Sequence, residues 1–390
     1  MVSHLCRESF LSLWSYPNPQ RRDGRELCDV LVVCDPDIII FSVKNVGFVE
    51  NDTTGERRWY RRAVQDSVRQ IYGAERELRN LSAVIRSDGS PGLKLPDPER
   101  RRIHRVAVAM GSNREVSLYP GNAGKGYVHL FDEISTDIIL RELDTISDFV
   151  EYLRELEGFQ GIIRVDGGEE ELLGSFILNQ RKLPADSKML FVLSGVWDEV
   201  SRKPEFLARK AADRFSYAWD RLIEFLSENL TYSVTGPPPT LDEAELVVRT
   251  MARETRFGRR ILAGQFADWH RHRASRSRIV PALSGVVYVF LATRPDHERK
   301  ARIAELEARC FVARGLRPEA KTVVGLGTEE YGSEGFSFDV VYYHLPVWTD
   351  AHTEDMQALQ AKFGIFSEVR ETRVSGDEFP IQGPPKQKHH

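Results

Sequence analysis

Two nearly continuous apolar segments near the N-terminus restrict the fold of this chain more than any other feature. Cys28 to Cys34 and Ile38 to Lys44 have the length and composition of buried strands. The residues between them, Asp35-Pro36-Asp37, are typical of a turn. The sequence therefore predicts a buried β-hairpin.

The register of this hairpin determines which polar side chains meet. If Cys34 pairs with Asp37, the same register places Asp29 opposite Ser42, and directly opposed residues project to one face. Lys44 shares that face, because side chains alternate along a strand. Charged residues at the ends of such an apolar pair cost several kcal/mol unless they are paired or bind a metal.

The segments around the hairpin predict a helix, hairpin, helix and strand in that order. Residues 5 to 15 have a helical pattern and end before the breaker Tyr16-Pro17-Asn18-Pro19. Residues 57 to 80 repeat apolar side chains at helical spacing. Strands follow at Ile103 to Met110 and Tyr127 to Phe131. The expected class is α/β (α+β), with a mixed sheet flanked by helices.

The length of 390 residues predicts two domains. We place the first at 1–158 and the second at 159–380, where strand and helix patterns alternate as in a mixed α/β domain. Residues 381–390 are polar and proline-rich and predict a flexible tail. Gly325 and Gly327 lack a following Gly-Lys-Ser/Thr, so we expect a hairpin turn there and not a phosphate loop.

Composition narrows the cellular setting. The formal charge of −4 argues against a surface that is basic throughout, although local basic patches remain open. No apolar run approaches the length of a membrane-spanning helix, and the N-terminus lacks the layout of a signal peptide, so we expect a cytoplasmic protein with no membrane contact. The four cysteines form no CxxC spacing and predict buried free thiols.

The hairpin residues carry a resemblance to a known superfamily. Glu26-Leu27-Cys28-Asp29 before one strand and Phe41-Ser42-Val43-Lys44-Asn45 at the end of the next resemble the PD-(D/E)XK nucleases. This superfamily includes restriction endonucleases, Holliday-junction resolvases and nuclease-related domains of bacterial defence proteins. The resemblance covers about the first 110 residues. It implies a restriction-endonuclease-like core of helix, hairpin or three-stranded meander, helix and strand.

The resemblance also implies a reaction. The chain would be a Mg²⁺-dependent (or Mn²⁺-dependent) endonuclease that hydrolyses DNA, with a role in antiviral defence or DNA processing. Asp29 would bind the metal, Lys44 would position water and offset charge in the transition state, and Glu8 would match an acidic residue of the first helix. Hard divalent cations prefer such oxygen ligands.

One position departs from the pattern of the family, which usually has Glu, Asp or Gln where this chain has Ser42. A neutral hydroxyl is a weaker metal ligand, so Glu26 is our candidate for a replacement ligand. Gln65 is our candidate for the glutamine that the second helix often contributes. We assign the catalytic role to these three residues together with Asp29 and Lys44.

Clustered arginines predict where nucleic acid, most simply DNA, would bind. The segment from Arg249 to Arg278 has nine arginines against Glu254 and Asp268, a net charge of +7, and could instead bind an acidic protein partner. Its aromatic residues, such as Trp269, fit a core better than a stacking platform. The expected contact residues are Arg58, Arg61, Arg62, Arg69, Arg101, Arg102, Arg259 and Arg260.

Three other interpretations stay open at this point. The hairpin could hold only an Asp29–Lys44 salt bridge. The chain could keep the nuclease fold as an inactive scaffold that binds nucleic acid or a partner protein, an interpretation that Ser42 favours. It could also be active only in a complex with a partner, and it could form a homo-oligomer.

Overall fold

The computed structural model describes residues 1–48, 53–184, 188–229, 237, 239–272, 277–294, 296–329, 337–367 and 377–379. The chain divides into two compact units, Met1–Ala208 and Arg209–Pro380. The division comes well after the expected boundary at residue 158. Residues beyond 158 stay with the first unit through contacts such as the Tyr152 hydroxyl with Glu169 Oε1, 3.0 Å, and Arg181 Nη2 with Asp148 Oδ1, 2.6 Å.

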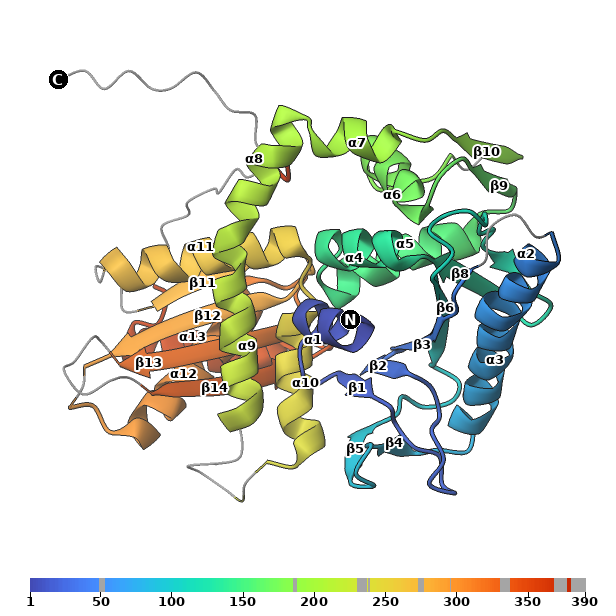
Figure 1. Ribbon diagram of the computed structural model, residues 1–390. Helices are drawn as coiled ribbons and strands as arrows, with labels where there is room; N and C mark the ends of the chain where they lie inside the picture. Colours follow the sequence, from blue (N-terminus) through green and yellow to red (C-terminus); the bar gives the residue numbers. More distant parts are fainter. Residues whose placement is uncertain are drawn as a thin grey trace. The chain divides into compact units, whose positions relative to one another are not determined.

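A six-stranded mixed sheet with the order β1-β2-β3-β6-β8-β7 forms the centre of the first unit (Figure 1). The first three strands form an antiparallel meander, β6 and β8 run parallel to β3, and β7 is antiparallel to β8. The strands are β1 (Ser15–Pro17), β2 (Val30–Cys34), β3 (Asp37–Asn45), β6 (Arg102–Met110), β7 (Gly121–Asn122) and β8 (Tyr127–Phe131). The mixed α/β class and the expected order of elements are confirmed.

The predicted helix at 5 to 15 was wrong in its extent. α1 ends at Phe10, and the following segment, which we expected to be a breaker, forms β1 and pairs with β2. Tyr16 and Pro17 occupy this short strand. Proline is tolerated there because β1 is an edge strand of the sheet.

Helices cover both faces of this sheet (Figure 1). On one face Phe41 of β3 and Phe131 of β8 pack on Phe149, which also contacts Phe10. All four rings are fully buried, and each contributes about 1.5–3 kcal/mol of hydrophobic stabilisation. On the opposite face, α3 packs against β3 and β6. The helices are α1 (Val2–Phe10), α2 (Thr53–Tyr60), the π-helical η1 (Arg61–Gln65), α3 (Asp66–Leu78), α4 (Glu133–Glu142) and α5 (Ile146–Gly158).

The remaining elements of the first unit are shorter. β4 (Ala83–Ile85) and β5 (Pro91–Lys94) form a short antiparallel hairpin between α3 and β6. β9 (Ile162–Val165) and β10 (Met189–Val192) form a separate two-stranded parallel sheet. The helices are α6 (Glu169–Leu178), α7 (Val196–Ser201) and α8 (Pro204–Asp213), which crosses the division between the units.

The second unit contains a four-stranded mixed sheet with the order β11-β12-β13-β14, as expected of a mixed α/β domain. α12 packs on β12, β13 and β14, and its Leu306 and Cys310 belong to the main apolar core of the unit. The elements are η2 (Arg214–Ser216), α9 (Tyr217–Asn229), α10 (Leu241–Ala252), α11 (Arg256–His272), β11 (Ser277–Pro281), β12 (Val287–Thr293), α12 (Arg299–Leu316), β13 (Thr322–Glu329), β14 (Phe338–His344) and α13 (Asp350–Phe363).

The glycines that we assigned to a hairpin turn lie inside β13. Gly325 and Gly327 face α12, and a Cβ on Gly325 would lie 2.6 Å from Cys310 Sγ and 2.9 Å from Leu306 Cγ. The turn assignment was therefore wrong, and these glycines allow close approach of helix and sheet.

Gly325→Ala is expected to destabilise the second unit by about 1–3 kcal/mol, because the added methyl group overpacks this contact. Urea denaturation followed by circular dichroism measures the change. Gly264→Ala is the matched control: no atom lies within 4 Å of a Cβ at this position in α11, so alanine should raise stability by about 0.5–1 kcal/mol. Equal destabilisation by both changes would contradict the close approach.

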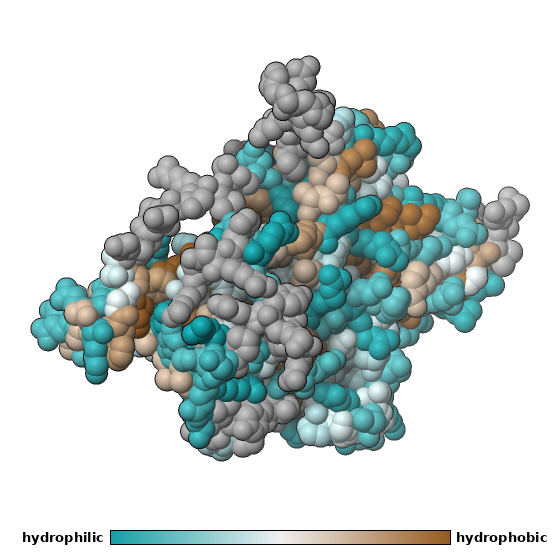
Figure 2. All heavy atoms as spheres, turned by 90° about the vertical axis from the view of Figure 1, so that its left-hand side faces the viewer, coloured by the Kyte–Doolittle hydropathy of each residue, from teal (hydrophilic) through white to brown (hydrophobic). Residues whose placement is uncertain are grey.

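Within the described part of the chain, no helix combines the length and the apolar character needed to cross a membrane. The face of the molecule in Figure 2 is mainly hydrophilic, with apolar atoms in separate areas. Scattered apolar residues of this kind are ordinary on protein surfaces.

Candidate functional site

The hairpin has the predicted register. Cys34 pairs with Asp37 and Val30 with Phe41, so the next position places Asp29 opposite Ser42. Asp29 Oδ2 accepts a hydrogen bond from the backbone N–H of Val43 at 2.8 Å. The carboxylate is therefore held directly beside the strand end that carries Lys44.

Ser42 is fully buried, and its hydroxyl donates to Gln70 Oε1 of α3 at 3.0 Å. The glutamine that reaches this part of the site is thus Gln70. Gln65, which we had chosen, lies on η1 and lines a groove next to Val128 and Leu130 of β8. The two glutamines project to different sides of one helix.

Lys44 shares a face with Ser42, and its side chain is partly exposed at the end of β3. It forms no ion pair or hydrogen bond with any described residue, so the Asp29–Lys44 salt bridge of the simplest interpretation does not form. An ammonium group without a partner beside a carboxylate is available to a ligand.

Glu26 completes a small group of charges with Asp29 and Lys44. Its backbone forms an isolated bridge with Gln20, which holds it at the entry to β2. Partial desolvation raises the pKa of Glu26, the nearby charge of Asp29 raises it further, and Lys44 acts in the opposite direction. Two carboxylates that repel each other form an arrangement that a bound cation can stabilise.

Glu8 does not join this group. It is an exposed residue of α1, and its carboxylate lies 3.3 Å from His4 Nε2. In the described ranges, no cluster of three or more His, Cys, Asp or Glu side chains could hold a metal ion. The expected metal set of Asp29, Glu26 and Glu8 therefore reduces to Asp29 and Glu26.

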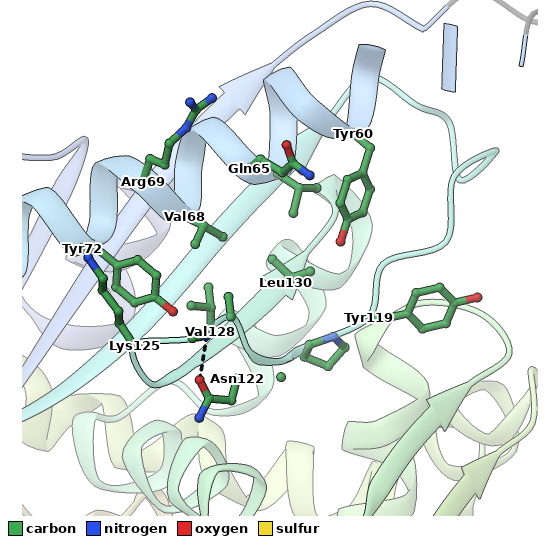
Figure 3. A pocket seen from close by; sticks show the side chains of 15 residues that line it. Tyr60, Gln65, Val68, Arg69, Tyr72, Tyr119, Asn122, Lys125, Val128 and Leu130 are labelled. Atoms are coloured by element: carbon green, nitrogen blue, oxygen red, sulfur yellow. Dashed lines mark hydrogen bonds between the residues drawn. The ribbon is translucent and has the colours of Figure 1, made fainter. Parts of the chain in front are cut away.

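The arginines of the second helix differ in their availability. Arg58, Arg61 and Arg62 are exposed and form no ion pair with another described residue. Arg69 is exposed but pairs with Asp66, and its guanidinium points away from the groove in Figure 3. The first three therefore keep the charge that a phosphate backbone needs.

Arg101 and Arg102, two more of the expected contact residues, differ in their roles. Arg101 donates to three backbone carbonyl groups, those of Pro96 at 2.5 Å, Leu78 at 2.6 Å and Leu81 at 3.0 Å. It fastens the segment before β6 to the end of α3. Arg102 begins β6 and is exposed, so its side chain is accessible.

Two arginines of α11, Arg259 and Arg260, are not available as the predicted nucleic-acid contacts. Arg259 is 1% exposed and donates to Asp220 Oδ1 at 2.7 Å, and Arg260 donates to Asp213 Oδ1 at 3.0 Å. Acidic residues outside this segment, such as Asp220 and Asp213, therefore offset part of its net charge of +7. Trp269 is buried against Phe290, as expected of a core residue.

A groove of about 810 Å³ lies between the second helix and the β7–β8 hairpin (Figure 3). Tyr60 and Tyr72 direct their rings toward the hairpin, and apolar side chains of α3 and β8 form the floor. Asn122 Oδ1 accepts from the N–H groups of Gly124 at 2.9 Å and Gly126 at 3.2 Å, which fixes the hairpin turn. Gly126 has a positive φ of 116°, a conformation that favours glycine.

A buried polar network that our sequence analysis missed lies on the other face of the sheet. His104 Nδ1 is 2.8 Å from Glu157 Oε1 and His104 Nε2 is 3.2 Å from Asp37 Oδ1, while His129 Nε2 is 3.3 Å from the same Glu157 oxygen. The available signal was a histidine inside each of two apolar strands. Neither strand indicates the glutamate of α5 that joins them.

No protein-family model matches the chain, and comparisons with curated proteins and with solved structures found no match. The site must therefore be interpreted from its own geometry.

Proposed function

We propose that the chain is a metal-dependent nuclease that hydrolyses phosphodiester bonds of nucleic acid, most simply DNA, at the Glu26, Asp29 and Lys44 group. The observation that carries the proposal is the placement of Asp29 on the backbone of Val43, beside an unpaired Lys44. The surrounding order of helix, three-stranded meander, helix and parallel strand supports it, since the PD-(D/E)XK core that these residues resemble has the same order.

The donor set fits Mg²⁺ or Mn²⁺ in part. Magnesium is commonly held by one or two carboxylates together with water and substrate phosphates, so Asp29 and Glu26 can suffice once a phosphate is bound. In an antiparallel ladder the N–H and C=O of one residue face the same neighbour, so the Val43 carbonyl also faces the Asp29 side. When bound, the ion would polarise the phosphate and lower the pKa of a water molecule.

The chain's own residues would orient the substrate. The Lys44 ammonium can donate hydrogen bonds to a non-bridging phosphate oxygen, where negative charge grows during hydrolysis. The Ser42–Gln70 hydrogen bond fixes the strand end that carries Lys44 against α3. Gln70 is therefore a positioning residue, and the role that we had given to Gln65 passes to it.

A second candidate is an inactive scaffold that binds nucleic acid or a partner protein. Ser42 favours it, because a buried neutral hydroxyl bonded to Gln70 offers no negative charge to a metal. In that case the protein binds no magnesium that depends on Asp29. Isothermal titration with Mg²⁺ on the wild type and on Asp29→Asn separates the two candidates.

Lys44→Ala and Asp29→Asn are each expected to lower Mg²⁺-dependent cleavage of DNA at least about 100-fold, because each removes a group that acts on the transition state. Plasmid nicking with purified protein measures the rate, and EDTA should abolish it. Lys300→Ala is the matched control, since it removes the same charge from an exposed position in the second unit. Cleavage at the wild-type rate by Lys44→Ala would sink the assignment.

A further inference from the structure

The groove has the side chains that nucleobases use for stacking. Tyr60 is half-buried with its ring directed toward the β7–β8 hairpin, and its hydroxyl forms no hydrogen bond with a described residue. Tyr119 lies at the other side of the groove, and it is 47% exposed. Tyr72 is fixed by its hydrogen bond to the Gly126 carbonyl at 2.9 Å. Aromatic rings stack on bases of any sequence.

The charge of the groove is positive. Its charged lining residues are Arg69 and Lys125, but Arg69 pairs with Asp66 and directs its guanidinium away from the groove, so Lys125 supplies the positive charge. No carboxylate is among the described residues that line it. Lys125 is exposed and has no ion pair with a described residue. Arg61 and Arg62 directly follow Tyr60 in sequence and also form no ion pair with a described residue, so they add two exposed cations to the helix that forms one wall of the groove. A polyanion is the matching ligand.

The two-stranded β9–β10 sheet extends this surface. The Arg164 guanidinium of β9 lies over the Tyr119 ring, 5.2 Å from its centroid. Arg164 pairs in register with Phe191 of β10, which is 62% exposed. Met189 and Leu193 flank Phe191 on the same face and are also exposed. A basic residue between two exposed aromatic rings repeats the chemistry of the groove.

The geometry points to an unpaired nucleic-acid strand as the ligand of the groove, with bases on Tyr60 and Tyr119 and its path continuing past Arg164 to Phe191. The inference rests on the proposed nuclease function and specifies the form of its substrate. Stacking on Tyr119 requires bases whose faces are open, which a duplex does not offer. Both this groove and the Asp29–Lys44 site lie on the sheet face that α3 covers, on either side of that helix.

Fluorescence anisotropy of the full chain tests the inference, with a labelled single-stranded DNA and the corresponding duplex in EDTA. The single strand should bind more tightly than the duplex. Tyr119→Ala and Phe191→Ala should each weaken single-strand binding about 5- to 10-fold, while Tyr119→Phe, which keeps the ring, should not. Both side chains are exposed, so these variants should fold normally.

Salt dependence gives a second readout. Lys125→Ala should lower the slope of log K against log salt by about 0.7, the value for loss of one phosphate contact on a single strand. Lys300→Ala should leave the slope unchanged. Equal affinity for single strand and duplex, or full binding by Tyr119→Ala, would overturn the inference. A Phe191→Ala variant that binds normally and changes only self-association would overturn the path over β9–β10.

The two proposals can fail separately. Wild-type protein that binds single strands in EDTA and never cleaves them with Mg²⁺ would contradict the nuclease and keep the groove. Protein that cleaves with Mg²⁺, and whose Tyr119→Ala variant keeps both cleavage and binding, would contradict the groove alone.

Discussion

Arg302→Ala is expected to lower the free energy of unfolding of the second unit by about 3–5 kcal/mol. Arg302 is 1% exposed, and its guanidinium bonds Asp339, lies 3.0 Å from Glu329 Oε1 and donates to Ser337 Oγ at 2.6 Å. Removal of this cation leaves the buried Asp339 and the partly buried Glu329 without their shared partner. Uncompensated charges of this kind are among the most destabilising changes in proteins.

The same carboxylate supplies the control. Arg299 Nε lies 2.6 Å from Asp339 Oδ1, but its side chain is 45% exposed, so Arg299→Ala should cost about 1 kcal/mol or less. Hydrogen exchange followed by mass spectrometry reports the opening of the second unit separately, which suits a chain of two units. Similar losses in both variants would show that burial does not determine the contribution of Arg302.

Glu157→Gln is expected to destabilise the first unit by about 3–5 kcal/mol at pH 7. Burial alone would raise the pKa of Glu157, but hydrogen bonds and charges from His104 and His129 outweigh it and hold the pKa at about 2. Glutamine keeps the size of the side chain and removes the charge. Glu8→Gln is the matched control, because Glu8 also pairs with a histidine but at the surface, and it should change stability by less than about 0.5 kcal/mol.

The pH dependence has a definite sign for each group of this network. The contribution of Glu157 is present above the ordinary carboxylate pKa and is lost as pH falls toward about 2. Burial lowers the pKa of His104, but Asp37 and Glu157 outweigh it and raise the pKa, so the contribution of His104 is lost as pH rises through that raised value. Burial lowers the pKa of His129, which favours the folded state above the ordinary histidine pKa.

Urea denaturation of wild type and Glu157→Gln from pH 7 down to acid conditions measures these contributions. The difference between the two proteins should shrink as pH falls below the ordinary carboxylate range, since Glu157 is then neutral in more of the unfolded chains. A difference that is constant with pH would show that the loss comes from altered packing.

The hairpin and its polar face could be predicted because their causes are local. The two-residue turn Asp35-Pro36 between two apolar runs sets the register, and parity then places Asp29, Ser42 and Lys44. The order of helix, hairpin, helix and strand along the chain could also be predicted from local patterns. No local pattern indicates that Tyr16 and Pro17 form an edge strand, because this strand forms only where β2 leaves a free edge of the sheet.

The positions that sequence analysis misplaced depend on distant partners. Arg259 looked like a surface cation because its own segment is basic, yet Asp220, far back in the chain, neutralises it inside the core. The histidines His104 and His129 meet through Glu157, which belongs to another element. Contacts between residues far apart in the sequence cannot be predicted from local patterns, even when they contribute strongly to stability.

The choice of Gln65 over Gln70 has a different cause. Helical spacing shows which residues share a side of the helix, but only the packed structure shows which side meets β3. η1 adds a complication, because its wide turn closes with a bond from the Asp66 N–H to the Arg61 carbonyl. Such π turns are rare and occur frequently at functional sites.

This wide turn contains one residue more than an α-helical turn, and the extra residue changes the direction in which the preceding side chains point. Each helical residue turns the chain by about 100°, so the segment that ends at Tyr60 faces a direction that an uninterrupted helix would not give it. Trp59 can then donate to the Val46 carbonyl at 2.7 Å while Tyr60 faces the groove. Deletion of one residue from Arg61–Gln65 would turn Trp59 away from Val46 and Tyr60 away from the groove, although neither of these two residues is itself changed. In this helix the number of residues in the π turn helps to determine where the side chains before it point.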